Sequence, residues 1–378
     1  MIRYISPAIL KKFRGKTCLL RVDLNAKPGR EKKFLRVEAV LPTIKTLLKN
    51  GNKVVILSHR GRPRVGRTSP RHGAGRPKQF SLRPFAAILE KKLNQEVVFL
   101  PALPRVVVPR NNKVFLLENL RFWKGEEKND LRFARRLARL ADFYVNDAFA
   151  VSHRRDASVS AITRYLPSYG GLLLEKEIKN LGGILKYTTH PFVVVIGGAK
   201  IGDKLGIIDY LWNKADYFLL GSGPAATFFA AKGLPIGDSL VDRDSIPKIK
   251  KFVGSKKLVL PLDVKIKNKQ ILDIGEKTAK NYSAIISKAR TIVWNGPVGM
   301  FERKEFSEGT KAIWRAILAN RKAQTVVGGG ETLASFRLLK TKSYKLKANI
   351  FLSTGGGAML EYLSGKKLPG ITALEISN

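Results

Sequence analysis

Two lysines in the second half of the chain have a spacing that suits phosphate binding. Lys200 ends the segment FVVVIGGAK, and Lys204 follows four residues later. Five apolar residues in this segment predict a buried strand, and Gly197 and Gly198 predict a sharp turn. If a helix begins near Gly202, both ammonium groups stand on one face beside its unpaired N–H groups. Such a site suits a polyphosphate, although the P-loop pattern GxxxxGK[ST] is absent. On this stretch alone, an ordinary strand-turn-helix unit with surface lysines fits equally well.

The first half places polar and cationic side chains where predicted strands end and helices begin. Ligands of open α/β sheets meet the carboxyl ends of the strands. The guanidinium fork of arginine suits bidentate capture of phosphate or carboxylate. Each residue alone is an ordinary turn or solvated residue, whereas their convergence would form a site for a small anion. The set is Asp23, Asn25, Arg36, His59, Arg62, Arg121 and Arg154.

Glycine turns precede predicted helices at four places in the second half of the chain. They lie at 197–198, 221–223, 328–330 and 355–357. One such turn is weak support for a site, because glycine turns are common in α/β folds. Four turns in one domain predict that several helix N-termini face a common anion.

Segments typical of strands and helices alternate through both halves, which is the signature of βαβ units and parallel sheets. A chain of 378 residues exceeds the size at which one core keeps growing. We therefore predict an α/β fold of two Rossmann-like parallel-sheet domains joined by a long helix and hinge. The predicted boundaries are an N-terminal domain over 1–168 with the returning segment 366–378, an inter-domain helix over 169–186, and a second domain over 187–365.

The charge balance is strongly basic, with 70 Lys and Arg against 29 Asp and Glu and a formal net charge of +41. This balance suits a polyanionic partner, whether nucleic acid, an anionic surface or phosphorylated metabolites. A generally basic surface explains most of it, because the excess is spread along the chain. The basic stretch 64–79 lacks the aromatic residues that stack on bases, so we expect a solvated loop and no specific nucleic-acid partner.

Cysteine content and hydropathy predict a cytoplasmic protein. Cys18 is the single cysteine, which excludes an intrachain disulfide and is expected to be a buried, inert thiol. No apolar run reaches the roughly 18 residues of a membrane span, and the N-terminal segment lacks the features of a signal peptide.

Eleven segments, taken together, resemble the motifs of one enzyme family. They are RVDLN, LPTIKTLL, LSHRGRP, LLENLRF, YVNDAFAVSHR, GGLLLEKEI, GGAKIGDK, WNGPVGMFE, GGGET, STGGGAMLE and LPGI. They occur in the order found in phosphoglycerate kinases and cover nearly the whole chain. The sequence therefore resembles that family with high specificity.

The resemblance implies a monomeric hinge-bending kinase that uses Mg²⁺. Phosphate would move reversibly between 1,3-bisphosphoglycerate and ADP, giving 3-phosphoglycerate and ATP. The anion set of the first half would bind the phosphoglycerate. The transferring group would pass between Arg36, Lys200 and the turn at Gly355 and Gly356, and Glu331 would serve the metal. The nucleotide would contact Gly198, Lys200, Lys204, Gly221, Gly223, Leu240, Asn295, Met300, Glu302, Gly329, Gly330 and Thr332, with Leu240 and Met300 lining the base pocket and Glu302 at the ribose.

Some positions depart from the family pattern. Glu331 replaces an Asp, and the extra methylene moves the carboxylate by about an ångström, which matters for the strict geometry of Mg²⁺. Asp156 stands near Arg154 where His is common, and Gly202 replaces Ser or Ala. One alternative is a catalytically weak family member with an added role in binding anions or nucleic acid. Another is a nucleotide kinase that acts on a different acid. The intact arginines and lysines favour the active enzyme.

Overall fold

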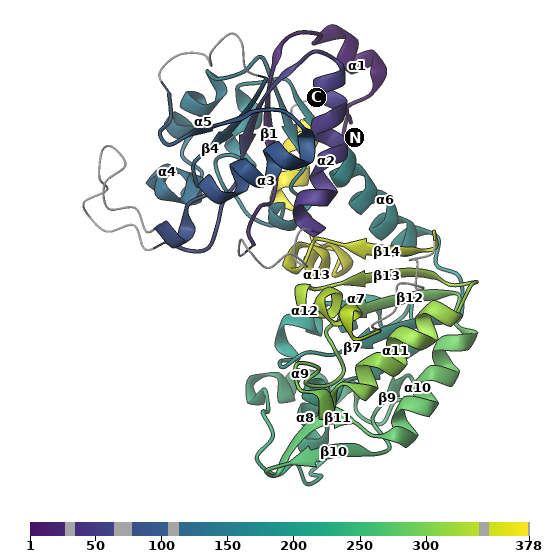
Figure 1. Ribbon diagram of the computed structural model, residues 1–378. Coiled ribbons are helices and arrows are strands. Elements are labelled where there is room, and N and C mark those ends of the chain that lie inside the picture. The colour runs from purple at the N-terminus through teal and green to yellow at the C-terminus, as the bar shows by residue number, and fades with distance from the viewer. Residues whose placement is uncertain (27–34, 64–77, 105–112, 340–347, 377–378) are drawn as a thin grey trace. The chain divides into compact units, whose positions relative to one another are not determined.

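The computed structural model describes residues 1–26, 35–63, 78–104, 113–339 and 348–376 (Figure 1). These residues form two compact units, Met1–Ile178 with Lys367–Asn378, and Lys179–Lys366. Residues 64–77 of the predicted basic loop lie outside the described ranges.

The first unit is built on a parallel sheet with the strand order β3-β4-β2-β1-β5-β6. All residues of β1, β4 and β5 are buried, as expected for parallel strands covered on both faces. Cys18 in β1 is among them, and burial raises the pKa of its thiol well above the ordinary value. The strands are β1 (Thr17–Arg21), β2 (Lys53–Leu57), β3 (Val97–Leu100), β4 (Val114–Leu117), β5 (Phe143–Asn146) and β6 (Ser168–Gly170).

The helices of the first unit pack apolar faces against this sheet. The helix α2 buries Val37, Val40, Ile44 and Leu47, a spacing that lines one helix face. In α5, the Asp130 side chain accepts from the backbone N–H of Phe133 and caps the helix. The helices are α1 (Pro7–Lys12), α2 (Leu35–Lys49), α3 (Arg83–Leu93), α4 (Lys124–Glu127), α5 (Leu131–Ala138) and α14 (Pro369–Ile376).

The second unit is built on a parallel sheet with the order β14-β13-β12-β7-β8-β9. The predicted strand at 192–196 is β7, and all its residues are buried. The strands are β7 (Phe192–Ile196), β8 (Tyr217–Leu220), β9 (Leu258–Val259), β12 (Thr291–Asn295), β13 (Gln324–Gly328) and β14 (Ile350–Ser353), with an antiparallel hairpin of β10 (Val264–Lys267) and β11 (Gln270–Ile274).

Two neighbouring helices of the second unit, α10 and α11, contribute to its core (Figure 1). Trp294 of β12 and Trp314 of α11 are fully buried, with ring centroids 4.7 Å apart. The helices are α7 (Leu205–Leu211), α8 (Ser222–Ala231), α9 (Ile246–Ile249), α10 (Glu276–Lys288), α11 (Glu308–Ala319), α12 (Gly330–Ser335) and α13 (Gly357–Leu363).

The two six-stranded parallel sheets confirm the predicted α/β fold with two parallel-sheet domains. The predicted start of the connecting helix at 169 is wrong. Residues Ser168–Gly170 form β6, because they pair with β5, and the helix α6 spans Leu172–Lys186. The division between the units falls within α6, after Ile178.

The first turn of α6 is capped by Asp147, which follows β5. Its Oδ1 accepts from the backbone N–H groups of Leu173 at 2.8 Å and Leu174 at 3.1 Å. We expect Asp147→Ala to lower the free energy of unfolding by about 1 to 2 kcal/mol, because helix donors then lose their acceptor. Asp147→Asn keeps an acceptor oxygen and should lose less. Urea denaturation of both variants measures this, and equal losses would contradict a capping role.

Candidate active site

The ends of β1 and β2 and the start of α2 bring together three segments of the first unit. Asp23 is buried just after β1, and its Oδ2 accepts from Nη1 of Arg36 in the first turn of α2. The same Nη1 lies 3.3 Å from the backbone oxygen of Asn25. The Asn25 Oδ1 accepts from the backbone N–H of Gly61 at 2.9 Å. Asp23, Asn25 and Arg36 therefore lie beside the segment that carries His59.

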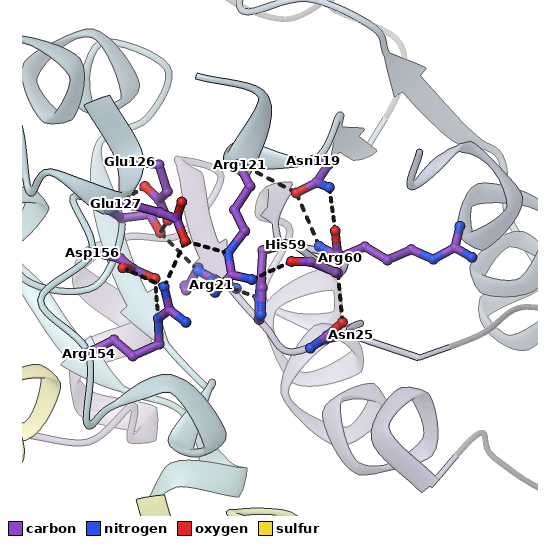
Figure 2. Close-up of polar contacts among 12 residues, drawn as sticks. Arg21, Asn25, His59, Arg60, Asn119, Arg121, Glu126, Glu127, Arg154 and Asp156 are labelled. Carbon is purple, nitrogen blue, oxygen red and sulfur yellow. Dashed lines mark hydrogen bonds and ion pairs between the residues drawn. The ribbon is translucent and has the colours of Figure 1, made fainter. Parts of the chain in front are cut away.

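Arg121 and Arg154 approach each other through one shared carboxylate (Figure 2). Oε1 of Glu127 lies 3.3 Å from Nε of Arg121 and 3.1 Å from Nη2 of Arg154. Asp156, one of the departures from the family pattern, accepts from Nε of Arg154 at 2.9 Å. Nη1 of Arg121 also donates to the backbone oxygen of Gly61. The shared Glu127 and the neighbouring Asp156 thus offset the repulsion between the two guanidinium groups.

His59 lies among these guanidinium groups and is only 3% exposed. Its pKa is held well below the ordinary value, first by burial and then by four cations, namely Arg21, Arg121, Arg154 and Arg36. Nη2 of Arg21 lies 3.3 Å from Nδ1 of this imidazole, and the other three guanidiniums lie near enough to act on its charge. Arg62, in contrast, is exposed and has no hydrogen bond or ion pair to any described residue.

Four further residues of this centre were missed from the sequence: Arg21, Glu126, Glu127 and Ser158. Arg21 ends the otherwise apolar segment TCLLR, and a charged residue in a buried strand was a usable signal. Glu126 is fully buried, and its two oxygens accept from the hydroxyl of Ser158 at 2.5 Å and the backbone N–H of Ser158 at 3.0 Å. No pattern in the sequence pairs residues so far apart.

The buried Glu126 predicts a pH-dependent stability. Burial raises the pKa of its carboxyl from the ordinary 4.5 to about 7. Its contribution to stability is therefore fully present below about pH 4.5 and lost as the pH rises to about 7, a change of about 3 kcal/mol. We expect the difference in unfolding free energy between the parent protein and Glu126→Gln to fall by this amount across that range. The exposed Glu90→Gln is the control, and a flat difference for Glu126→Gln would contradict the prediction.

The lysine pair of the second unit does not stand on one helix face, so that expected geometry is wrong. Residues Gly202–Lys204 form a 3₁₀ turn, and α7 begins at Leu205. Oδ2 of Asp242 accepts from the Gly202 N–H at 2.9 Å, and a Cβ at Gly202 would lie 2.7 Å from that oxygen. The glycine at this departure from the family pattern therefore leaves room for Asp242, which holds the turn.

The two lysines have different environments. The side chain of Lys200 is exposed, whereas Lys204 is 9% exposed and its Nζ donates to the backbone oxygen of Lys200 at 3.2 Å. Burial lowers the pKa of Lys204, while the nearby carboxylates of Asp203 and Glu331 oppose the shift. Lys204 therefore lies within electrostatic range of Glu331 at the start of α12.

The ends of β7, β12 and β13 meet beside this lysine. The Gly197 N–H donates to the backbone oxygen of Asn295 at 3.0 Å, and the Gly296 N–H donates to Oγ1 of Thr332 at 2.8 Å. Gly329 precedes α12 with φ of 94°, a left-handed conformation that favours glycine, and Gly330 is the first residue of that helix. Nδ2 of Asn295 is buried without a hydrogen-bond partner among the described residues.

The end of β7 and the start of α8 approach each other closely at three glycines, Gly198, Gly221 and Gly223. The Gly221 N–H donates to the backbone oxygen of Ile196 at 2.8 Å, which places the start of α8 beside the end of β7. A Cβ at Gly223 would lie 2.2 Å from the Gly198 oxygen, so only glycine fits there.

The side chains of Leu240 and Met300 are 57% and 42% exposed. Hydrogen bonds connect the chain at both positions to β11. The Ser239 hydroxyl accepts from the Ile271 N–H at 2.9 Å, and the Met300 N–H donates to the Leu272 oxygen at 2.8 Å. The residue before Leu240 and the backbone of Met300 therefore bond to adjacent residues of one strand.

The remaining predicted residues are Glu302, Gly355 and Gly356. Glu302 is exposed and has no hydrogen bond or ion pair to any other described residue. The Gly355 N–H donates to the Ser353 hydroxyl at 3.1 Å, and Gly356 precedes α13 with φ of 52°.

The side chains of the second unit suit a metal ion that takes most of its ligands from a bound substrate. The described residues contain no group of three or more His, Cys, Asp or Glu side chains that could hold a metal ion. Glu331 offers one exposed carboxylate at the second residue of α12. Mg²⁺ is commonly bound by one or two carboxylates together with substrate phosphates and water, so this residue suits that ion.

None of the helices within the described ranges has the length and apolar character needed to cross a membrane.

Comparison with known proteins identifies the family. The family model for phosphoglycerate kinase matches residues 10–366. The phosphoglycerate kinase of Chloroflexus aggregans is 41% identical over 396 residues, covering 96% of this chain and 97% of that protein. The enzyme of Thermosipho africanus is 41% identical over 398 residues, covering 96% of each chain.

Solved structures agree with these relatives. The structure of phosphoglycerate kinase from Coxiella burnetii has a TM-score of 0.81 and 35% identity, and the match covers 99% of each chain. That from Pyrococcus horikoshii has a TM-score of 0.81 and 32% identity, covering 100% of this chain and 99% of that one. With its fold and its sequence matching over nearly the full length of the chain, this chain belongs to the phosphoglycerate kinase family.

Proposed function

We propose that the cationic centre of the first unit binds the phosphoglycerate in the reaction of this kinase. The observation that carries the assignment is the group of guanidiniums near His59, in which Arg121 and Arg154 share the Glu127 carboxylate and Arg21 contacts the imidazole. Nη2 of Arg121 is also buried without a hydrogen-bond partner among the described residues, and a buried donor of this kind suits a ligand oxygen. The proposed set is Asp23, Asn25, Arg36, His59, Arg62, Arg121 and Arg154.

The second unit binds ATP or ADP, which are substrates of the family's reaction. Lys200 and Lys204 lie along the phosphates, and Nδ2 of Asn295 donates to a phosphate oxygen. The buried donor of Asn295 and the helix start at Gly330 support this placement. Leu240 and Met300 supply apolar contacts to the base. The remaining proposed contacts are Gly198, Gly221, Gly223, Glu302, Gly329 and Thr332.

The chemistry requires positioning and charge neutralisation by the protein. In the ATP-consuming direction, a carboxylate oxygen of 3-phosphoglycerate attacks the γ-phosphorus, and the bond from that phosphorus to the β,γ-bridging oxygen breaks. No general base is needed, because the attacking carboxylate is already ionised. Arg36, Lys200 and the helix start at the turn of Gly355 and Gly356 stabilise the charge on the transferring group. Because the two sets belong to different units, the units must approach each other for transfer.

Glu331 holds the Mg²⁺ that accompanies the nucleotide. The Glu331 carboxylate would hold the ion together with the bound nucleotide, and the ion would supply neutralisation of phosphate charge there. We further propose a monomer that acts in the cytoplasm, in line with the single, buried cysteine.

The test is ADP formation from MgATP with 3-phosphoglycerate as the acceptor. Activity should require the acceptor and disappear when EDTA removes the metal. Glycerate lacks the phosphate that the arginines would bind, so it should be a poor acceptor. ADP formation at the level of the no-acceptor control, from protein that is folded by circular dichroism, would overturn the assignment.

A further inference from the structure

Arg21 is a fully buried cation whose guanidinium makes three separate contacts. Figure 2 shows the contact with His59. Its Nε donates to Oγ of Ser158 at 2.9 Å, and its Nη1 donates to the backbone oxygen of Val22. Its Nη2 lies 3.3 Å from Nδ1 of His59. A buried guanidinium held at three points has one orientation, so the group facing His59 is defined.

The contact with Ser158 determines the direction of the hydrogen bonds that link Arg21, Ser158 and Glu126. The guanidinium can only donate, so the Ser158 oxygen accepts from Arg21. The single hydroxyl proton of Ser158 then points to Oε1 of Glu126, 2.5 Å away. The Ser158 N–H donates to Oε2 of the same carboxyl at 3.0 Å. Glu126 therefore fixes Ser158, and Ser158 fixes Arg21.

The same reasoning determines where the proton of His59 lies. Because Nη2 of Arg21 can only donate, Nδ1 of His59 must accept through its lone pair. A neutral imidazole with a free lone pair on Nδ1 carries its proton on Nε2. No described residue forms a hydrogen bond with Nε2, which leaves that atom available to a ligand.

We propose that Arg21 is a positioning residue that holds His59 as the neutral Nε2–H tautomer, and that Glu126 and Ser158 keep Arg21 in that position. The proposal rests on the assignment of His59 to phosphoglycerate binding. His59 then serves as an uncharged donor to a substrate oxygen, while the arginines supply the positive charge. Protonation of Nδ1 would place an N–H against the N–H of Arg21, close to Arg36, Arg121 and Arg154, and is disfavoured by all four cations.

Nitrogen NMR of the free protein tests the tautomer independently of activity. The chain has 4 histidines, so a long-range ¹H–¹⁵N spectrum of ¹⁵N-histidine-labelled protein is simple, and His59→Gln assigns the His59 signals. We expect a protonated Nε2 and an unprotonated Nδ1 that stay unchanged from about pH 6 to 8. A protonated Nδ1 or a doubly protonated ring at pH 7 would overturn the proposal, even if the enzyme is fully active.

Arg21→Met tests the positioning role, with Arg60→Met as the matched control. Arg60 follows His59 in the chain, but its side chain donates to the Ser81 backbone oxygen, 2.8 Å away. Arg21→Met should give a mixture of His59 tautomers and raise KM for 3-phosphoglycerate about tenfold, with little change in kcat or in KM for ATP. Arg60→Met should leave the His59 signals and all three constants unchanged. A folded Arg21→Met variant with the parent tautomer would overturn the role of Arg21.

Ser158→Ala provides a milder test if Arg21→Met fails to fold. It removes the hydroxyl between Arg21 and Glu126 and leaves both charged groups in place. We expect a shift in the His59 nitrogen signals and a severalfold rise in KM for 3-phosphoglycerate, with an unchanged KM for ATP. Unchanged nitrogen signals together with an unchanged KM would refute the part assigned to Ser158 and Glu126.

Discussion

Replacing Arg36 with methionine is expected to lower kcat/KM for phosphoryl transfer by about 10³-fold or more. The transition state spreads negative charge over three phosphoryl oxygens, and a guanidinium stabilises it more strongly than the ground state. The side chain of Arg36 is 32% exposed and pairs with Asp23. Its removal also leaves Asp23 unpaired beside an anionic substrate. Steady-state kinetics with both substrates should therefore show a fall in kcat as well as a rise in KM for 3-phosphoglycerate.

The control for Arg36→Met is Arg136→Met, which removes an exposed guanidinium from α5. This variant should retain the parent rate and Tm. If Arg36→Met kept more than a tenth of the parent kcat/KM, Arg36 would not act on the transferring group. Equal losses in both variants would instead point to the overall charge of the protein, an effect that added salt would screen.

The second large effect is expected for Lys200→Met, with a loss of about 10²- to 10³-fold in kcat. The exposed ammonium of Lys200 forms no hydrogen bond or ion pair with other residues in the described ranges, so its removal should leave Tm unchanged. Lys204 is buried and bonds to the Lys200 backbone oxygen, so Lys204→Met should lower both the rate and Tm.

Lys248→Met, at an exposed position in α9, is the control for the charge lost in Lys200→Met. A Lys200→Met variant with the parent kcat would contradict the role of Lys200 in transfer. Loss of activity together with a lower Tm in that variant would contradict the distinction between the two lysines. Measuring kcat at saturating MgATP separates this role from ground-state binding of the nucleotide.

Local patterns predicted the elements of this fold well, because each is encoded by neighbouring residues. The apolar run at 192–196 became the buried strand β7. The apolar spacing within α2 likewise places Val37, Val40, Ile44 and Leu47 in the core. The failures occurred at boundaries, where distant partners decide. Residues 168–170 became a strand because β5 was available to pair with them, and the turn at Gly202 is held by Asp242, 40 residues away.

The sequence by itself determined the parallel sheets, the glycine turns and the basic character of the chain. It also contains the motifs from which the candidate site residues were predicted. Periodicity and composition record which side chains are apolar, cationic or turn-forming, so these properties need no knowledge of distant contacts. Only the tertiary structure decided which cations face one another. Arg21 meets His59 across 38 residues and Ser158 across 137, and such pairings arise when the sheet brings remote strand ends to one edge. The protonation of His59 follows from that proximity, because a donor-only neighbour leaves its Nδ1 no role except acceptor.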